Sequence, residues 1–250
     1  MDQAQDIFNR ARLLLGDACM ERIASRRVLL FGVGGVGSWC AESLVRSGVQ
    51  HLTIVDADTV NITNVNRQLM ATTLTVGRPK VEALKERLLE INPMAGITPL
   101  QKLFSAETAE EFDLDSYDYI IDCIDSLKDK AFLIERASHC PGKLFSSMGA
   151  ALKIDPTRIR VAEFWDVHGD PLARALRKKL RKEGRETGKP VLCVYSEELL
   201  GNRGEAQEPS ADDIIRKACV NGSLAHITAI FGHTLAGLVL QDMSETEIFL

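Results

Sequence analysis

The stretch VLLFGVGGVG at residues 28–37 decides the fold of this 250-residue chain. An apolar run that leads directly into closely spaced glycines is typical of a strand, a tight turn and the start of a helix in a dinucleotide-binding α/β fold. Gly32 permits the tight turn, Gly34 lets the backbone approach a phosphate, and Gly37 lets the helix pack against the strand. The pattern alone is compatible with NAD, FAD, S-adenosylmethionine or ATP.

An acidic residue and a series of polar side chains follow the glycine loop. Asp56 ends the next apolar run, where its carboxylate can accept both hydroxyls of a ribose. Asp58 lies two residues further on and could equally cap the following turn. Asn64, Arg67 and Gln68 are spaced so that one helical face presents all three. The guanidinium of Arg67 can hold phosphate oxygens through two parallel hydrogen bonds, although a solvated loop cation is the simpler alternative.

Further charged residues favour a nucleoside triphosphate over a redox cofactor. Lys80 begins a predicted helix, where its charge opposes the helix dipole unless an anion such as a phosphate compensates it. Asp122 and Asp125 follow a predicted strand, and the carboxyl ends of parallel strands face the ligand crevice. We expect Asp125 to hold Mg²⁺ against the phosphates and Asp122 to hold the loop or cap a helix. A nicotinamide cofactor would use the glycines and Asp56 but would leave Lys80 and Asp125 without a role.

Composition narrows the class of protein. The net charge of −5 argues against nucleic-acid binding by the whole surface, and DNA is not an expected partner. No signal peptide is visible in the sequence, so we expect a cytoplasmic protein with reduced thiols. The six cysteines form no Cys-x-x-Cys pair, and zinc is therefore not expected. The apolar stretch 224–240 is shorter than the ~20 residues of a membrane span, which favours a core or dimer helix over a membrane-contacting one.

The alternation of predicted strands and helices indicates an α/β fold, a Rossmann-like and mostly parallel sheet with flanking helices. We expect residues 1–150 to form a Rossmann-like ATP-binding domain, and the resemblance described next implies that it is an adenylation domain. Residues 151–250 would form a C-terminal extension packed on the same domain. The extension contains a basic segment that could grip RNA phosphates, with a solvated helix face as the alternative. Its cations are Arg174, Arg177, Lys178, Lys179, Arg181 and Lys182.

Taken together, the motifs of the first half resemble the adenylation core of the ubiquitin-activating-enzyme-like superfamily. This superfamily includes the bacterial adenylyltransferases of thiamine and molybdopterin synthesis. The resemblance covers roughly residues 10–149 and is carried by the segments 32–38, 56–60, 64–68, 77–80 and 122–125. It implies that a carboxylate attacks the α-phosphate of ATP, which releases pyrophosphate and leaves an acyl-adenylate.

The same resemblance assigns roles to individual residues. It implies that Gly35 contacts ATP and that Asp56 binds the ribose. The phosphates would be bound by Asn64, Arg67 and Lys80, and Mg²⁺ by Asp125. The resemblance also implies a homodimer in which an arginine that precedes the first strand reaches the nucleotide of the partner subunit. Arg10 matches that position best, with Arg12 close by.

The second half resembles one branch of the superfamily, the tRNA threonylcarbamoyladenosine dehydratases. The segments that carry this resemblance are 147–150, 154–159, 170–178, 194–198 and 222–223. This branch uses ATP to cyclise the modified adenosine next to the anticodon, with net loss of water. The alternative is an adenylyltransferase that activates a ubiquitin-like sulfur carrier protein, a branch that usually carries two Cys-x-x-Cys zinc pairs. Cys219 is the best candidate for a functional thiol, and docking of a sulfur-transfer protein stays open.

Overall fold

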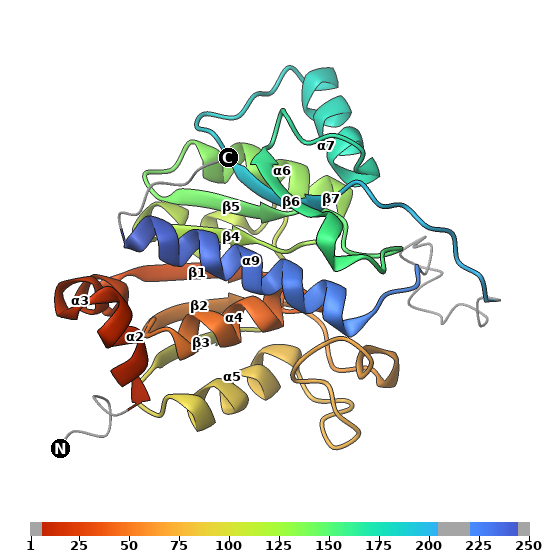
Figure 1. Cartoon of the computed structure of the whole chain (residues 1–250). Coiled ribbons are helices and arrows are strands. Elements are labelled where there is room, and N and C mark those ends of the chain that lie inside the picture. The colour runs from red at the N-terminus through yellow and green to blue at the C-terminus, as the bar shows by residue number, and fades with distance from the viewer. Residues whose placement is uncertain (1–6, 205–220, 245–250) are drawn as a thin grey trace.

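A computed structural model describes residues 7–204 and 221–244 of the chain. Its centre is a seven-stranded sheet in the order β3-β2-β1-β4-β5-β7-β6, in which only β6 runs antiparallel to its neighbour (Figure 1). The strands are β1 (Arg27–Phe31), β2 (His51–Val55), β3 (Gly96–Leu100), β4 (Tyr119–Asp122), β5 (Lys143–Ser147), β6 (Ile159–Glu163) and β7 (Leu192–Ser196). The predicted fold class, a mostly parallel Rossmann-like sheet with flanking helices, is confirmed.

Helices cover both faces of the sheet. They are α2 (Asn9–Leu15), α3 (Asp17–Ser25), α4 (Gly37–Arg46), α5 (Lys80–Ile91), α6 (Leu127–Ser138), α7 (Pro171–Lys182) and α9 (Ala225–Met243). Alternate residues of β1 show why two layers form, since Val28 and Leu30 join one apolar cluster while Leu29 and Phe31 join the other. The first cluster includes residues of α3, α4, α5 and α9, and the second includes residues of α6 and α7.

The second half of the chain continues the same sheet. β7 pairs in parallel with β5, and β6 pairs with the outer side of β7. The apolar stretch near the C-terminus forms α9. This helix packs closely across α4, as Gly232 indicates: a Cβ at this position would lie only 2.4 Å from the carbonyl oxygen of Val36. Among the described residues, no helix combines the length and the apolar character that a membrane crossing requires.

Candidate nucleotide-binding site

The glycine loop between β1 and α4 is closed too tightly for side chains. Gly32 has a φ of +82°, and a Cβ there would lie 2.6 Å from the carbonyl oxygen of Cys123. A Cβ at Gly37 would lie 1.9 Å from the carbonyl oxygen of Gly32. The loop and the first residue of α4 therefore lack side chains at Gly32 and Gly37, so backbone is open at the carboxyl edge of the sheet, which is the arrangement that binds phosphate groups.

Asp56 ties the end of β2 to the glycine loop. Its Oδ2 accepts a hydrogen bond from the backbone nitrogen of Val33 at 2.9 Å, and its Oδ1 accepts one from the backbone nitrogen of Asp58 at 2.9 Å. Burial raises the pKa of Asp56, and the charge of Lys80 opposes that rise. The carboxylate therefore lies beside the glycine loop at the carboxyl edge of the sheet.

Lys80 is buried at the start of α5, with 7% of its surface exposed. Its Nζ donates to Asp58 Oδ2 at 2.9 Å and lies 3.9 Å from Asp56 Oδ1. The electrostatic cost of a lysine at a helix start is thus compensated within the chain by two carboxylates. The sequence argument from the helix dipole did not include that compensation.

Arg67 and Asp125 come from distant segments and lie within electrostatic reach of each other. Burial lowers the pKa of Arg67, and the negative charge of Asp125 opposes that effect. The guanidinium of Arg67 donates to the carbonyl oxygen of Thr63 at 2.9 Å and to Asn66 Oδ1 at 3.0 Å. Asp125 is exposed on the loop after β4.

Asn64, Arg67 and Gln68 share one helical turn, since the backbone nitrogens of Arg67 and Gln68 donate to the carbonyl oxygen of Asn64 at 3.1 and 2.9 Å, but the side chains of Asn64 and Gln68 have different surroundings. A short 3-10 turn covers Ile62–Asn64, and Asn64 Oδ1 accepts the backbone nitrogen of Asn61 as part of a capping box. Gln68 is buried beside the glycine loop, with its Nε2 3.7 Å from where a Cβ of Gly34 would lie. Its buried Oε1 has no hydrogen-bond partner. An unpaired buried acceptor beside a glycine cradle fits a ligand that brings its own donor.

The residues present also fit a magnesium ion held chiefly by phosphates. Among residues 7–204 and 221–244, no group of three His, Cys, Asp or Glu side chains could form a metal cage. Magnesium is commonly bound by one or two carboxylates together with substrate phosphates, and Asp125 offers one such carboxylate at the strand edge.

A buried ion pair lies beneath the loop that carries Asp125. Asp122 Oδ2 lies 2.7 Å from Lys130 Nζ, and both side chains are fully buried. Asp122 also accepts hydrogen bonds from Ser146 Oγ at 2.7 Å and from the backbone nitrogen of Ile124 at 3.1 Å. Asp122 thus holds the loop, as the sequence predicted. The partner lysine was missed, although its position on the apolar face of a predicted helix was a signal.

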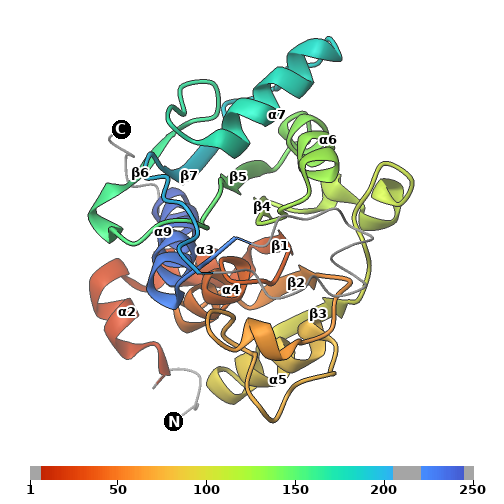
Figure 2. The ribbon, with the colours of Figure 1, turned by 90° about the vertical axis from the view of Figure 1, so that its right-hand side faces the viewer.

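Arg10 does not approach this site within one chain. It is exposed on α2, which lies beside the sheet and away from the carboxyl ends of β1 and β4 (Figures 1 and 2). Leu13 and Leu14 on the same helix are 80% and 83% exposed.

The predicted RNA-contacting cations all lie on α7 or at its end, and they divide into two groups. Arg177 donates to the carbonyl oxygen of Phe164 at 2.9 Å, and the guanidinium of Arg181 stacks 5.2 Å from the ring centre of Trp165. Arg181 is nevertheless exposed, as are the remaining predicted contacts Arg174, Lys178 and Lys182, whereas Arg177 is half-buried.

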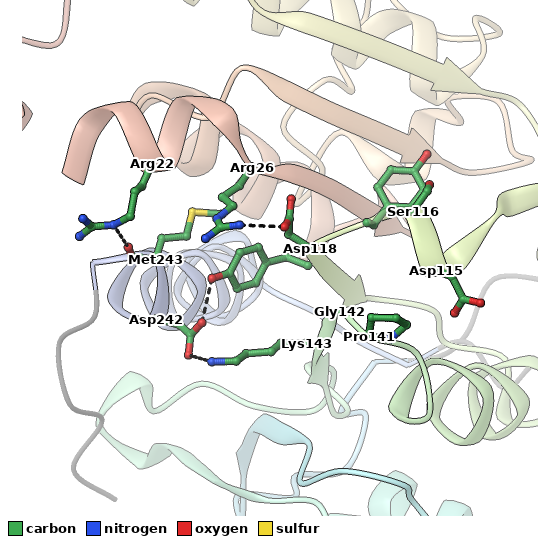
Figure 3. A pocket seen from close by; sticks show the side chains of 12 residues that line it. Arg22, Arg26, Asp115, Ser116, Asp118, Pro141, Gly142, Lys143, Asp242 and Met243 are labelled. Atoms are coloured by element: carbon green, nitrogen blue, oxygen red, sulfur yellow. Dashed lines mark hydrogen bonds and ion pairs between the residues drawn. The ribbon is translucent and has the colours of Figure 1, made fainter. Parts of the chain in front are cut away.

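A cavity of about 450 Å³ lies at the opposite edge of the sheet, at the amino ends of β4 and β5 (Figure 3). There Asp242 accepts hydrogen bonds from Tyr119 at 2.8 Å and from Lys143 at 2.6 Å. In parallel α/β sheets, ligands bind at the carboxyl ends of the strands, so this cavity is not the nucleotide site.

The fold and these residues define an α/β nucleotide-binding protein. The ThiF family model matches residues 8–247, and the chain belongs to that family. The chain is 40% identical over 238 residues to the tRNA threonylcarbamoyladenosine dehydratase of Bacillus subtilis, with 94% of each chain covered. The Escherichia coli dehydratase TcdA, solved in complex with ATP, superposes with a TM-score of 0.84 at 32% identity, with 97% of this chain and 96% of TcdA covered. The molybdopterin-synthase adenylyltransferase of E. coli is 35% identical over 179 residues, which are 70% of this chain and 69% of that protein.

Proposed function

We propose that the chain is an ATP-dependent tRNA threonylcarbamoyladenosine dehydratase. The observation that carries the proposal is the extent of the match. The B. subtilis dehydratase matches 94% of the chain, whereas the molybdopterin-synthase adenylyltransferase matches 70%. The full-length match includes the second half, where β6, β7 and the basic helix α7 lie. An activating enzyme for a ubiquitin-like sulfur carrier is the second candidate, supported by that partial match.

ATP supplies the adenylyl group that activates the threonyl carboxylate, and pyrophosphate leaves. A nitrogen or oxygen of the same side chain then attacks the activated carbonyl carbon and expels AMP, so the nucleoside loses the elements of water. Both atoms of the new bond belong to the RNA, and no protein nucleophile is needed. The role of the protein is to hold the carboxylate against the α-phosphate and to exclude water.

The described geometry supports a division of work among the site residues. In the proposal, the glycine loop and α4 bind phosphate, and Asp56 accepts the ribose hydroxyls. Arg67 and Lys80 offset the charge that develops on the phosphates, and Asn64 contacts them from the same loop. Asp125 would hold a magnesium ion, and such an ion would supply positive charge beside the phosphates.

The proposal also includes partners and a compartment. The exposed cations of α7 would hold tRNA phosphates, in the cytoplasm. Two copies of the chain would form a homodimer, with Arg10 acting on the nucleotide of the partner subunit. The exposed Leu13 and Leu14 support this, since burial of their side chains by a second copy would stabilise the pair. Cys219 lies outside the described residues, and docking of a sulfur-transfer protein remains part of the second candidate.

Release of AMP and pyrophosphate from ATP tests the proposal against its alternative. The protein is incubated with Mg-ATP and, in parallel, with tRNA that carries threonylcarbamoyladenosine, with tRNA that lacks it, and with a ubiquitin-like sulfur carrier. We expect AMP release only with the modified tRNA. Pyrophosphate exchange stimulated only by the carrier protein would replace the proposal with the second candidate.

A further inference from the structure

A buried lysine joins two loops at the carboxyl edge of the sheet, outside the nucleotide site. Lys153 follows β5 and is only 3% exposed. Its Nζ donates to the carbonyl oxygen of Ser196, the last residue of β7, at 3.1 Å and to that of Glu198 in the following loop at 2.6 Å. Burial lowers the pKa of Lys153, while the charges of Asp170 and Glu198 oppose that change. A lysine is costly to bury, so this one requires an explanation.

The side chain of Glu198 in turn binds the backbone next to Lys153. Its Oε2 accepts hydrogen bonds from the backbone nitrogens of Ile154 and Asp155, both at 2.8 Å. Each loop therefore supplies one charged side chain that satisfies the backbone of the other. We call this exchange between residues 153–155 and 196–198 the clasp.

The clasp adjoins the first turn of the basic helix. Asp170 caps α7 by accepting the backbone nitrogen of Ala173 at 2.8 Å on Oδ1. Asp170 is 1% exposed, and its Oδ2 would lie 3.5 Å from a Cβ at Gly149, at the end of β5. Burial raises the pKa of Asp170, and the nearby charge of Lys153 opposes that rise. Glu197 of the clasp also contacts the residues that lead into α7, since its Oε1 lies 2.8 Å from His168 Nε2.

The same loop reaches toward the nucleotide site. Leu152 has a φ of +59°, a strained conformation for a residue with a Cβ. Its nitrogen donates to the carbonyl oxygen of Gly222 at 2.9 Å, and its carbonyl oxygen accepts from the nitrogen of Leu200 at 2.9 Å. Ser223 follows Gly222 in the chain, and its carbonyl oxygen accepts a hydrogen bond at 2.9 Å from the Nδ2 of Asn66, the residue before Arg67. Leu152, which precedes the clasp, is therefore connected through Gly222 and Ser223 to the segment that carries Arg67.

We propose that Lys153 is a positioning residue, whose clasp with Glu198 fixes the basic helix α7 relative to the nucleotide site so that bound RNA meets the α-phosphate. The inference rests on the proposed function, because it assigns the RNA to α7. In the proposed function, ATP would lie against the glycine loop and Asp56, away from the clasp. Loss of the clasp should leave ATP affinity intact, and the exposed cations of α7 should still bind RNA. Only the alignment of the two substrates should suffer.

The test compares Lys153→Met with Lys189→Met in the full-length protein. Lys189 is a control for the hydrogen bonds alone: its Nζ also donates to two carbonyl oxygens, those of Cys140 at 2.6 Å and Pro141 at 2.8 Å, but it is exposed and lies near the amino end of β5. Calorimetry gives the affinity and stoichiometry for ATP, and filter binding gives the affinity for modified tRNA. Steady-state kinetics gives kcat and KM for dehydration. Full ATP stoichiometry shows that every molecule in the assay is folded.

For Lys153→Met we expect kcat to fall by about 10- to 100-fold, the cost of misaligned reactants, with full ATP stoichiometry and both affinities unchanged. Lys189→Met should keep the wild-type kcat. A second variant, Glu198→Gln, removes the charge of the clasp but keeps the shape of the side chain. It replaces Lys153→Met as the test if Lys153→Met binds less than one ATP per chain, and we expect its kcat to fall as well. Wild-type kcat in a folded clasp variant, or an equal loss of ATP affinity, would overturn the inference. A wild-type protein that does not dehydrate tRNA would instead refute the proposed function.

Discussion

Replacement of Lys130 by Met should destabilise the fold severely. Its Nζ lies 2.7 Å from Asp122 Oδ2, and neither side chain has any exposed surface. Methionine retains most of the side-chain volume, so the effect reports the lost charge rather than a cavity. Asp122 would keep the hydrogen bonds from Ser146 and Ile124 but would lose its only described cation. Removal of one partner of a buried pair costs about 3–5 kcal/mol, a large part of the stability of a domain.

Guanidinium denaturation of Lys130→Met, with linear extrapolation to water, measures this loss. The double variant Asp122→Asn with Lys130→Met removes both charges, and we expect it to recover most of the lost stability, because a neutral pair leaves no buried charge uncompensated. Lys143→Met is the control, since Lys143 is 60% exposed in its pair with Asp242 and should cost less than about 1 kcal/mol. A Lys130→Met variant no less stable than this control would refute the reasoning.

Three further predictions follow from the site, the basic helix and a buried thiol. Arg10→Ala and Asp125→Ala should each abolish AMP release. If Arg10 acts across a dimer, a mixture of the two variants should regain activity, because a mixed dimer contains one site with both residues intact. A mixture that stays inactive contradicts that arrangement. Neutralising Lys178 and Lys182 should weaken tRNA binding and lower its salt slope by about one per cation, with ATP affinity unchanged; an unchanged slope in filter binding would remove the RNA from this helix. Burial raises the pKa of the fully buried Cys193. The native thiol should therefore resist iodoacetamide at pH 8, as followed by peptide mass spectrometry, until the protein unfolds. Rapid labelling of the native protein would contradict the burial of this thiol. The unfolded thiol releases its proton above about pH 8.5 while the folded one retains it, so this group lowers the stability of the fold as pH rises through that range.

The sequence predicted the parts of the site that depend on strand ends. The glycines after β1, Asp56 after β2 and Asp125 after β4 could be located because a parallel sheet gathers its carboxyl ends at one edge. The pairing of Lys80 with Asp58 could not be read from spacing, since it depends on how the loop after β2 folds back onto the start of α5. Asn64 was assigned to a helical face but serves as a cap in a 3-10 turn.

Buried charges were the main omission, for a physical reason. Lys130 and Lys153 each stand among residues that read as an ordinary helix or loop, and their partners come from other strands. A lysine is usually exposed, so sequence patterns assign it to solvent unless a partner can be identified. The partners of Lys153 come together only because β7 pairs with β5 in the sheet. Asp122 and Lys130 are close in the sequence, but their contact depends on how the start of α6 packs back against the end of β4.

Mass spectrometry of nucleosides tests the central claim most directly. tRNA that carries threonylcarbamoyladenosine is incubated with the protein and Mg-ATP, digested to nucleosides and compared with a reaction without ATP. The account predicts that the modified nucleoside loses the mass of one water only when ATP is present. An unchanged nucleoside, with folded protein that binds ATP and with verified substrate, would contradict it.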